Sequence, residues 1–331
     1  MLRYCGPIAF LASIPLLYYG LGPAAPLLTV AALLLLLGGA ELVFPRGTAA
    51  APGKRGFRAL VLLYVPLQLG VIGWAAAAAA ATPLAGFIAL VLSAGVTTGV
   101  FGMLVAHEAV HSGDPFEHRI GTAMLTGMLY RHFRIAHLHG HHRWAATSRD
   151  AATARLGEGF YHFLARTVPG QFAEAQAFES LRCAQAPRPL LANRIVGDIA
   201  VYAVLLAAIA FFAGPWGLLL FCLQSAVAIF VLELFNYIAH YGLTRQLDVS
   251  GKPETLTGRH SWNSSNVIAN TLIFNMGRHS FHHARPTLSY QNLRVVEAAP
   301  ELPAGYAASI LLALAPPLWR RTMDAKVRQI G

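Results

Sequence analysis

Long apolar stretches with few charges dominate the hydrophobic pattern of this 331-residue chain. Six of them run at about 7–21, 24–44, 59–81, 84–106, 195–213 and 216–239. Each has close to the roughly 20 residues that a helix needs to cross the hydrocarbon core of a bilayer. The first is short and contains Pro15, so a signal-like or re-entrant segment is the alternative there. We expect a helical hairpin instead, because a Leu-Gly-Pro-Ala-Ala-Pro turn at 21–26 separates two apolar arms.

The pattern predicts an all-α, polytopic membrane protein with about six transmembrane helices. Composition agrees with this class, because 56% of the residues are hydrophobic and only 12% are charged. The two remaining long segments, 107–194 and 241–331, are expected to form a helical cap on one side of the membrane. We interpret residues 1–331 as a single membrane domain.

The positions of the basic residues predict the orientation of the spans. All 25 Lys and Arg residues lie at Arg3, at 46–58, at 119–194 or at 245–328. The positive-inside rule then places both termini and the segments 107–194 and 241–331 in the cytoplasm, as expected in a bacterial-type inner membrane. The net charge of +10 is interpreted as a cytoplasmic surface that attracts anionic lipid or an acidic protein, not nucleic acid.

Nine of the 14 histidines fall into four clusters. Several have helical spacing, which brings side chains onto one face, and neutral imidazole is the commonest metal ligand among side chains. The fourth and sixth stretches end beside two of the clusters, and the other two clusters lie in the predicted cytoplasmic segments. All four can therefore meet on one side of the membrane. The nine candidate ligands are His107, His111, His137, His141, His142, His240, His279, His282 and His283.

Individual clusters also allow other interpretations. His107-Glu108-Ala-Val-His111 matches the zinc-protease signature, in which the glutamate is the general base. His240 alone is more typical of a helix end, but Glu233 and Asn236 form one polar stripe with it on an apolar span. An ionisable group at the centre of a span costs roughly 2.5–3.5 kcal/mol, so Glu233 is a functional candidate. The alternative is a glutamate near the interface, paired with arginine or a hydroxyl.

The number of histidines favours two metal ions over one. A catalytic zinc takes three protein ligands, whereas nine histidines suit two ions with four or five ligands each. The three cysteines are isolated and include no CxxC, which excludes a zinc ribbon, an iron–sulfur centre or a fused rubredoxin. The paired Glu-x-x-His motifs of carboxylate-ligated di-iron bundles are absent from the sequence. We therefore interpret the clusters as a histidine-rich, non-haem di-iron centre.

The motifs around the histidines resemble the alkane 1-monooxygenase family of membrane di-iron enzymes, related more distantly to membrane fatty-acid desaturases. The resemblance covers roughly residues 60–328 and includes the histidine boxes, Trp144–Thr153, Asn236–Leu243, His260–Ser264, Pro286–Tyr290 and Met323–Val327. It implies that the nine histidines bind two irons and that O2 is the co-substrate. It also implies hydroxylation of an unactivated C–H bond in a hydrophobic substrate that enters from membrane lipid. The electrons would come from rubredoxin or ferredoxin and an NAD(P)H-dependent reductase.

Three departures from the family pattern remove carboxylates beside expected ligands. Ala136 and Ala239 stand where the family has glutamate, and Phe281 stands where it has aspartate. Carboxylates that hydrogen-bond to ligating imidazoles orient them, and losing one costs about 10–100-fold in metal affinity or activity. Either other polar residues replace them or the metal affinity is lowered; retention of all nine histidines favours the first. The candidate replacements are Glu108, Asp150, Glu233, Asn236 and His260.

Three other activities remain open from the sequence. A fatty-acyl desaturase or an aromatic-methyl hydroxylase would use the same metal site, and a membrane zinc metalloprotease would use the first cluster. Among the other histidines, His139 is expected on the opposite helical face from His141, towards solvent. Gly95, Gly99 and Gly102 allow either close helix approach or space for a tunnel.

Overall fold

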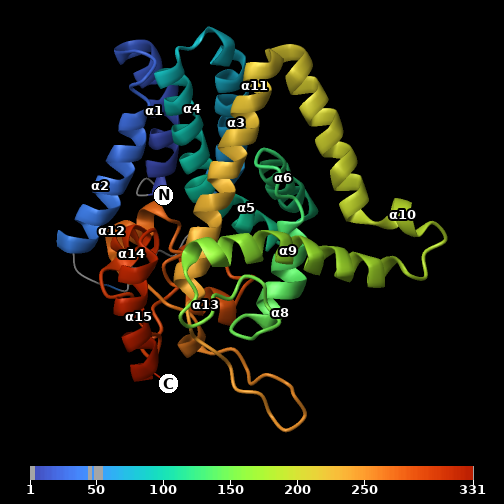
Figure 1. Cartoon of the computed structure of the whole chain (residues 1–331), viewed down its shortest axis with the longest axis vertical. Helices are drawn as coiled ribbons and strands as arrows, with labels where there is room; N and C mark the ends of the chain where they lie inside the picture. The colour runs from blue at the N-terminus through green and yellow to red at the C-terminus, as the bar shows by residue number, and fades with distance from the viewer. Residues whose placement is uncertain (1–3, 44–46, 48–54, 331) are drawn as a thin grey trace. The chain divides into compact units, whose positions relative to one another are not determined.

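The computed structural model describes residues 4–43, 47 and 55–330. Their regular structure is helical, and the only β-pairing among them consists of two isolated bridges. The α-helices are α1 (Gly6–Leu21), α2 (Leu27–Val43), α3 (Arg55–Ala78), α4 (Leu84–Thr97), α5 (Met103–Val110), α6 (Pro115–Thr126), α7 (Phe133–Ile135), α8 (His142–Trp144), α9 (Phe160–Cys183), α10 (Pro189–Ala192), α11 (Arg194–His240), α12 (Val267–Leu272), α13 (His279–Ala284), α14 (Gly305–Ala313) and α15 (Pro316–Ile330) (Figure 1). Short helical segments are η2 (Ala79–Ala81), η3 (Thr98–Gly102), η4 (Ala136–His141), η5 (Gly258–His260) and η6 (Tyr290–Asn292).

The chain divides into two compact units. The first comprises Met1–Leu35, Gly53–Arg134 and Gln176–Leu232, and the second comprises Leu36–Pro52, Ile135–Ala175 and Glu233–Gly331. The all-helical prediction is confirmed for the described residues. Arg3, Arg46 and Lys54, on which the predicted orientation partly depends, lie outside them.

The described residues of each predicted apolar stretch are mainly helical, but three helices among them are long and apolar enough to cross a membrane. They are Arg58–Ala81, Leu84–Val110 and Arg194–His240. The third, α11, covers both stretches predicted at 195–213 and 216–239. It is kinked between them at Gly214, where φ is 68°, immediately before Pro215. Its two arms meet at a sharp bend at the top of Figure 1. α1 and α2 are shorter apolar helices joined by the expected turn.

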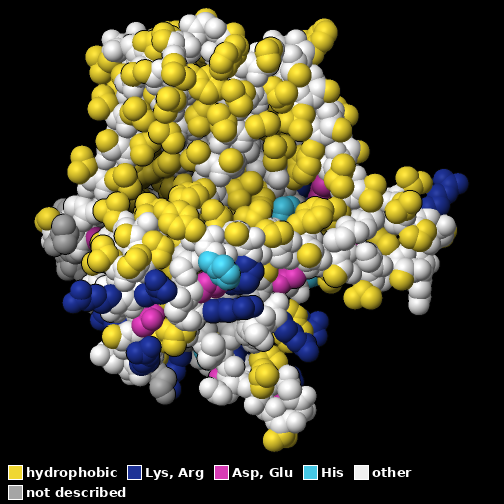
Figure 2. Space-filling model, in the orientation of Figure 1, with side chains coloured by type: hydrophobic (Ala, Val, Ile, Leu, Met, Phe, Trp, Pro, Cys, Tyr) yellow, Lys and Arg dark blue, Asp and Glu magenta, His cyan; other side chains and the backbone are white. Residues whose placement is uncertain are grey.

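The first unit exposes apolar side chains, as expected of helices that contact lipid. Leu35, Leu84, Phe211 and Phe212 are each more than two-thirds exposed. Figure 2 shows hydrophobic side chains spread over the visible face of this unit. Exposed apolar surface of this extent is unfavourable in water and favourable against lipid chains.

The interior of the first unit is packed through glycines. A Cβ at Gly95 would lie 2.5 Å from Val227 Cβ, and one at Gly99 would lie 2.7 Å from the carbonyl oxygen of Ala228. Gly95 and Gly99 therefore allow α4–η3 and α11 to pack closely. Of the two predicted roles, close helix approach applies at these two positions and space for a tunnel does not. Inside the unit, buried Gln68 donates to Thr98 Oγ1 at 2.9 Å and accepts from the Tyr64 hydroxyl at 2.6 Å, which satisfies its amide.

The second unit is held together by an aromatic cluster and an amphipathic helix. Trp319, Met323 and Val327 recur every four residues on α15 and are all buried. Because such spacing keeps side chains on one helical face, α15 packs this face inwards. The ring of Trp319 lies 5.3 Å from those of both Tyr237 and Tyr241. The C-terminal helix thus packs directly beside the end of α11 that carries His240.

Candidate metal centre

Seven of the nine predicted ligands lie in the second unit, where they form two groups. The first consists of His137, His142 and His282, and the second of His141, His240, His279 and His283. Within each group the candidate ligand nitrogens lie within 4.8 Å of one another. The remaining two candidates, His107 and His111, lie in the first unit, and their rings are 4.7 Å apart.

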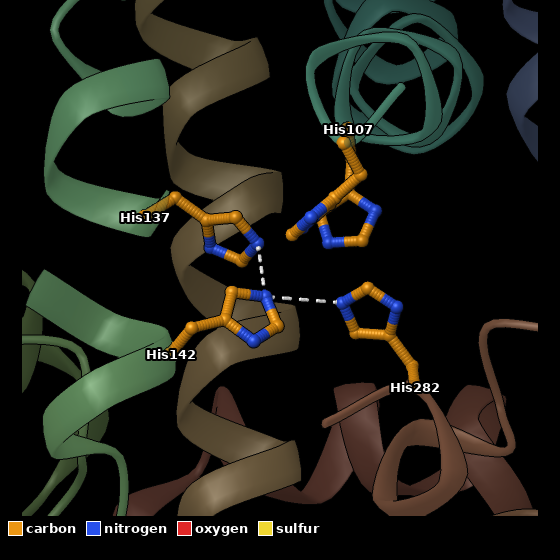
Figure 3. Close-up of side chains that lie close together, drawn as sticks. His107, His137, His142 and His282 are labelled. Atoms are coloured by element: carbon orange, nitrogen blue, oxygen red, sulfur yellow. Dashed lines mark hydrogen bonds between the residues drawn. The ribbon is translucent and has the colours of Figure 1, made fainter. Parts of the chain in front are cut away.

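In the first group His142 lies between its two neighbours. Its Nε2 is 3.0 Å from Nε2 of His137 and 3.2 Å from Nε2 of His282 (Figure 3). His137 and His282 are buried, and His142 is half-buried. The three imidazoles therefore point their Nε2 atoms towards one another.

In the second group all four histidines are buried. His279 lies between two others, with its Nε2 3.0 Å from Nε2 of both His240 and His283. The ring of His141 packs against those of His240 and His283, with centroids 4.6 Å and 4.8 Å away. This group joins three distant parts of the chain, because its members come from η4, the end of α11 and α13.

Two pairs of consecutive histidines divide between the groups. His141 belongs to the second group and His142 to the first, and His283 and His282 divide in the same way. The segment η4, at Ala136–His141, is a π-helix rather than the expected α-helix. Its wider turn places His137, His141 and His142 on the inner side, while His139 is exposed as predicted.

The chemistry of the donor set fits metal ions. Burial lowers the pKa of His279 to about 3 and that of His283 well below its usual range, so both imidazoles are neutral, which is the ligating form. Two nitrogens bound to one metal at roughly 2.1 Å and at a right angle lie roughly 3.0 Å apart, which matches the Nε2 spacing in both groups. The buried Nε2 of His141 has no hydrogen-bond partner among the described residues.

Asp150 orients one of the buried candidate ligands. Its Oδ2 lies 2.8 Å from His141 Nδ1 and accepts a hydrogen bond from Thr153 Oγ1 at 2.6 Å. Its Oδ1 accepts from the backbone N–H of Ala152 at 3.1 Å. The carboxylate therefore holds the proton of His141 on Nδ1 and turns Nε2 towards the other imidazoles of its group.

The other predicted supporting residues have different partners. Glu233 accepts hydrogen bonds from Thr167, Gln171 and Asn236, at distances between 2.8 and 3.2 Å. His260 caps the short helix η5 by accepting the N–H of Thr257, and its Nε2 lies 3.4 Å from Glu254. Glu108 lies half-buried on α5 in the first unit, so its predicted role stays a prediction.

One further carboxylate near the centre comes from α9, a helix in which the sequence indicates no site residue. Glu174, on α9, accepts the backbone N–H of Ala151 at 2.8 Å and so braces the loop that carries Asp150. Its burial, together with the nearby charge of Asp150, raises its pKa to about 7. Glu174 follows His142 by more than 30 residues, so no local spacing indicates it.

Two further contacts hold the cluster of His279, His282 and His283 in place. Asn263 donates from Nδ2 to Ser280 Oγ at 2.6 Å and accepts the N–H of Ser280 at 3.0 Å. Buried Arg278 donates to the carbonyl of Leu293 at 2.6 Å. These bonds fix both the start of α13 and its first turn. The His-Ser-Trp-Asn-Ser run was the available signal for Asn263, whereas no feature of the sequence indicated the partner of Arg278.

Apolar side chains occupy the three positions at which the family pattern has carboxylates. Ala136 and Ala239 are buried, and Phe281 is half-buried. The carbonyl of Ala239 accepts the N–H of Trp262 at 2.8 Å, which ties the end of α11 to the run before α13.

Comparisons with known proteins identify relatives of this chain. A family model described as fatty acid desaturase matches residues 81–311. Alkane 1-monooxygenase 2 of Pseudomonas aeruginosa is 37% identical over 277 residues, which cover 82% of this chain and 74% of the relative. Alkane 1-monooxygenase 1 of the same organism is 34% identical over 330 residues, with 97% and 84% covered.

A more distant relative extends the comparison to aromatic substrates. The xylene/toluene monooxygenase hydroxylase component XylM of Pseudomonas putida is 29% identical over 234 residues, which cover 69% of this chain and 61% of that protein. The matched region of the family model includes all nine candidate ligands. The chain therefore belongs to the alkane 1-monooxygenase family, a group of monooxygenases within the fatty acid desaturase family.

Proposed function

We propose that this monooxygenase hydroxylates the terminal methyl group of an n-alkane or alkyl chain at a centre of two iron ions. The observation that carries the proposal is the arrangement of seven histidines of the second unit in two groups with facing nitrogens. We further propose that His107 and His111 complete the first group, which would then have five ligands and the second four. Support for this pair comes from its i, i+4 spacing and from the family pattern.

Two bound irons would supply the redox chemistry of the reaction. In that reaction R–H, O2, two electrons and two protons yield R–OH and water. The protein contributes neutral imidazoles, because burial disfavours their protonation. Asp150 keeps the proton of His141 on Nδ1. The buried second group excludes water, which protects a reactive centre from side reactions.

The proposal includes six spans with both termini in the cytoplasm of a bacterial inner membrane. It is supported by the absence of Lys and Arg from 59–118 and 195–244 and by the apolar helices of the first unit. We propose one domain over 1–331, in which the second unit is the cytoplasmic cap. A hydrophobic substrate would then enter from the lipid.

The electrons are proposed to come from rubredoxin or ferredoxin, reduced by an NAD(P)H-dependent reductase. The chain has no flavin or nicotinamide fingerprint of its own. An acidic donor suits the positive net charge of +10, because opposite charges accelerate encounter. The initial rate of donor oxidation should therefore fall as ionic strength rises.

A second candidate activity is hydroxylation of a methyl group on an aromatic ring, which the similarity to XylM favours. Family membership supports a monooxygenase rather than the zinc protease that the first cluster alone allowed. Fatty-acyl desaturation remains the third activity to test. Products formed from an n-alkane, a methyl-arene and a fatty ester separate these activities.

The test uses membranes that contain the full chain, supplied with rubredoxin or ferredoxin, the reductase, NADH and O2. We expect a primary alcohol from the n-alkane and about two irons per purified chain. His279→Ala should abolish the alcohol and lower the iron content, whereas His139→Ala, at an exposed position of the same histidine-rich region, should change neither. Fewer than two irons in the wild type would overturn the di-iron centre, and an alkene as the main product would overturn hydroxylation.

A further inference from the structure

A groove in the first unit has walls of two kinds. It lies between α3, α6 and α11 and has a volume of about 610 Å³. This is within the range of roughly 300–1,000 Å³ that is typical of ligand pockets. Helices α3 and α11 line it with the apolar side chains of Leu69, Ile72, Ala76, Leu205, Ile209 and Phe221. Every polar side chain in the lining comes from α6 or the turn after it, namely Arg119, Thr122, Thr126 and Arg131.

The polar wall carries an excess of positive charge. Arg131 donates to Asp198 Oδ1 at 2.6 Å and to Thr126 Oγ1 at 2.8 Å. Arg134 binds the same carboxylate through both of its terminal nitrogens. Asp198 is thus shared by two guanidinium groups, and one of the two positive charges is left uncompensated.

Arg119 adds a second uncompensated charge. Its side chain is exposed, and the structure gives it no ion pair with any carboxylate of the described residues. The threonine hydroxyls cannot act as donors to a ligand, because Thr122 and Thr126 each donate to the backbone carbonyl four residues earlier, at 2.8 Å. An anion at this wall would therefore be held by the two guanidinium groups.

We propose that this groove binds one acyl chain of an anionic phospholipid, with its phosphate at Arg119 and Arg131. A neutral hydrocarbon would use the apolar walls but not the charges, and a free anion would use only the charges. Basic pockets between transmembrane helices bind acidic lipid headgroups elsewhere. The groove is built entirely from residues of the first unit and includes none of the nine candidate metal ligands.

Two matched pairs of variants separate the contributions of the apolar walls and of the charged wall to lipid binding. A Cβ at Gly73, which lines the groove, would meet no atom within 4 Å, so Gly73→Leu places a side chain in open space. Gly70, on the same helix and outside the groove, has the same open surroundings, and Gly70→Leu is its control. Arg119→Gln removes the exposed charge, and Arg188→Gln removes an exposed arginine of the same unit outside the groove.

The measurement is native mass spectrometry of the purified full chain, titrated with phosphatidylglycerol or phosphatidylcholine of identical acyl chains. We expect the wild type to bind one phosphatidylglycerol molecule tightly and to bind phosphatidylcholine more weakly. Arg119→Gln should weaken phosphatidylglycerol binding by about fivefold and phosphatidylcholine binding by less, because the choline cation offsets part of the charge of the phosphate. Gly73→Leu should remove the tight lipid, and both controls should behave like the wild type.

Three outcomes would overturn the proposal. The first is equal affinity of the wild type for the two lipids. The second is tight phosphatidylglycerol binding that survives both Gly73→Leu and Arg119→Gln. The third is displacement of the lipid by hexadecane with equal efficiency in wild type and Arg119→Gln, which would identify the groove as a hydrocarbon site. Glycerol phosphate at the same concentration should not displace the lipid, because it lacks the acyl chain.

Discussion

Asp150 contacts a candidate ligand directly, because its Oδ2 lies 2.8 Å from His141 Nδ1. Replacing it with alanine leaves the Nδ1 proton of buried His141 and the hydroxyl of Thr153 without their acceptor. Loss of a carboxylate that orients a ligating imidazole costs about 10–100-fold in metal affinity. We expect Asp150→Ala to bind iron more weakly by this factor, as measured by competition with a chelator at fixed pH.

The control for this prediction is Glu297→Gln, at an exposed acidic position of the same unit. It should bind iron like the wild type, and Asp150→Asn should fall between the two because an amide oxygen can still accept from Nδ1. Unchanged iron affinity in Asp150→Ala would show that His141 is oriented by packing alone.

At the residue scale, the sequence indicated the candidate metal ligands better than the hydrogen-bond partners of polar groups. Clusters and spacing were enough to select nine candidate ligands, because each cluster is local in the chain, and seven of these histidines lie in two groups in the structure. The partners of polar groups are not local. Arg245, for example, donates to the carbonyl of Ala145, 100 residues earlier, and no pattern along the chain predicts such a pair.

The turn after α11 depends on one glycine. Gly242 has a φ of +70°, and a Cβ there would lie 2.9 Å from Val327 Cγ2 on α15. Its N–H donates to the carbonyl of Ala154 at 2.9 Å. A left-handed conformation costs an L-residue roughly 1–2 kcal/mol, before any clash is counted. We expect Gly242→Ala to lower the thermal unfolding midpoint in detergent and to lower the iron content.

Gly251 provides a matched comparison, because its φ is +74° but a Cβ would meet no atom within 4 Å. Gly251→Ala carries the backbone cost without the contact with α15. The difference in midpoint between the two variants therefore measures the packing of the turn against α15. Equal midpoints would mean that Val327 moves aside freely.

The end of α9 is joined to the start of α11 by an ion-pair cluster that should respond to acid. Burial raises the pKa of Glu179, but hydrogen bonds from Arg182 and Arg194 outweigh it and lower the pKa to about 2. A carboxyl whose pKa is depressed on folding stabilises the protein above its unfolded pKa, here about 4.5, and loses this effect as pH falls towards 2.

The test is the apparent unfolding midpoint in detergent at a fixed scan rate, measured between pH 7 and pH 3. The wild type should lose stability below about pH 4.5, and Glu179→Gln should be less stable at pH 7 and lose less on acidification. Parallel curves for the two proteins would mean that other carboxylates cause the acid sensitivity.

At the element scale, apolar length predicted where helices lie but not their internal irregularities. The stretches at 84–106 and 216–239 correspond to helices within a few residues. The π-helical segments η3 and η4 were not predicted, because a wider turn changes the hydrogen-bond register without changing the hydrophobic pattern. The Gly214-Pro215 pair signals the kink in α11, and the stretch predicted at 195–213 ends just before it.

The predicted topology determines which introduced cysteines a membrane-impermeant reagent can reach in intact cells. On a background without Cys5, Cys183 and Cys222, a cysteine at Ala81 should react with a membrane-impermeant maleimide. A cysteine at Val249, in an exposed loop of the second unit, should react only after the cells are opened. Labelling of both sites in intact cells would contradict two cytoplasmic segments.

At the scale of the whole molecule, the apolar stretches predicted a helical fold, and the resemblance of the histidine motifs to a known family predicted the monooxygenase activity. The division of the histidines into one group of four and another that includes His137, His142 and His282 was not predicted. Spacing alone assigns His141 and His142 to the same cluster. Only the fold of η4 and α13 sends neighbouring side chains to different groups.

This division has a consequence for how the centre fills. His141 and His142 share a peptide bond, as do His282 and His283, and each pair serves both groups. A first ion that fixes the backbone at either pair also positions a nitrogen for the second ion. Titration of the apoprotein with ferrous ion should therefore be cooperative, with native mass spectrometry showing protein with two ions or none and little with one. A variant that lacks one ligand of either group should lose both ions together.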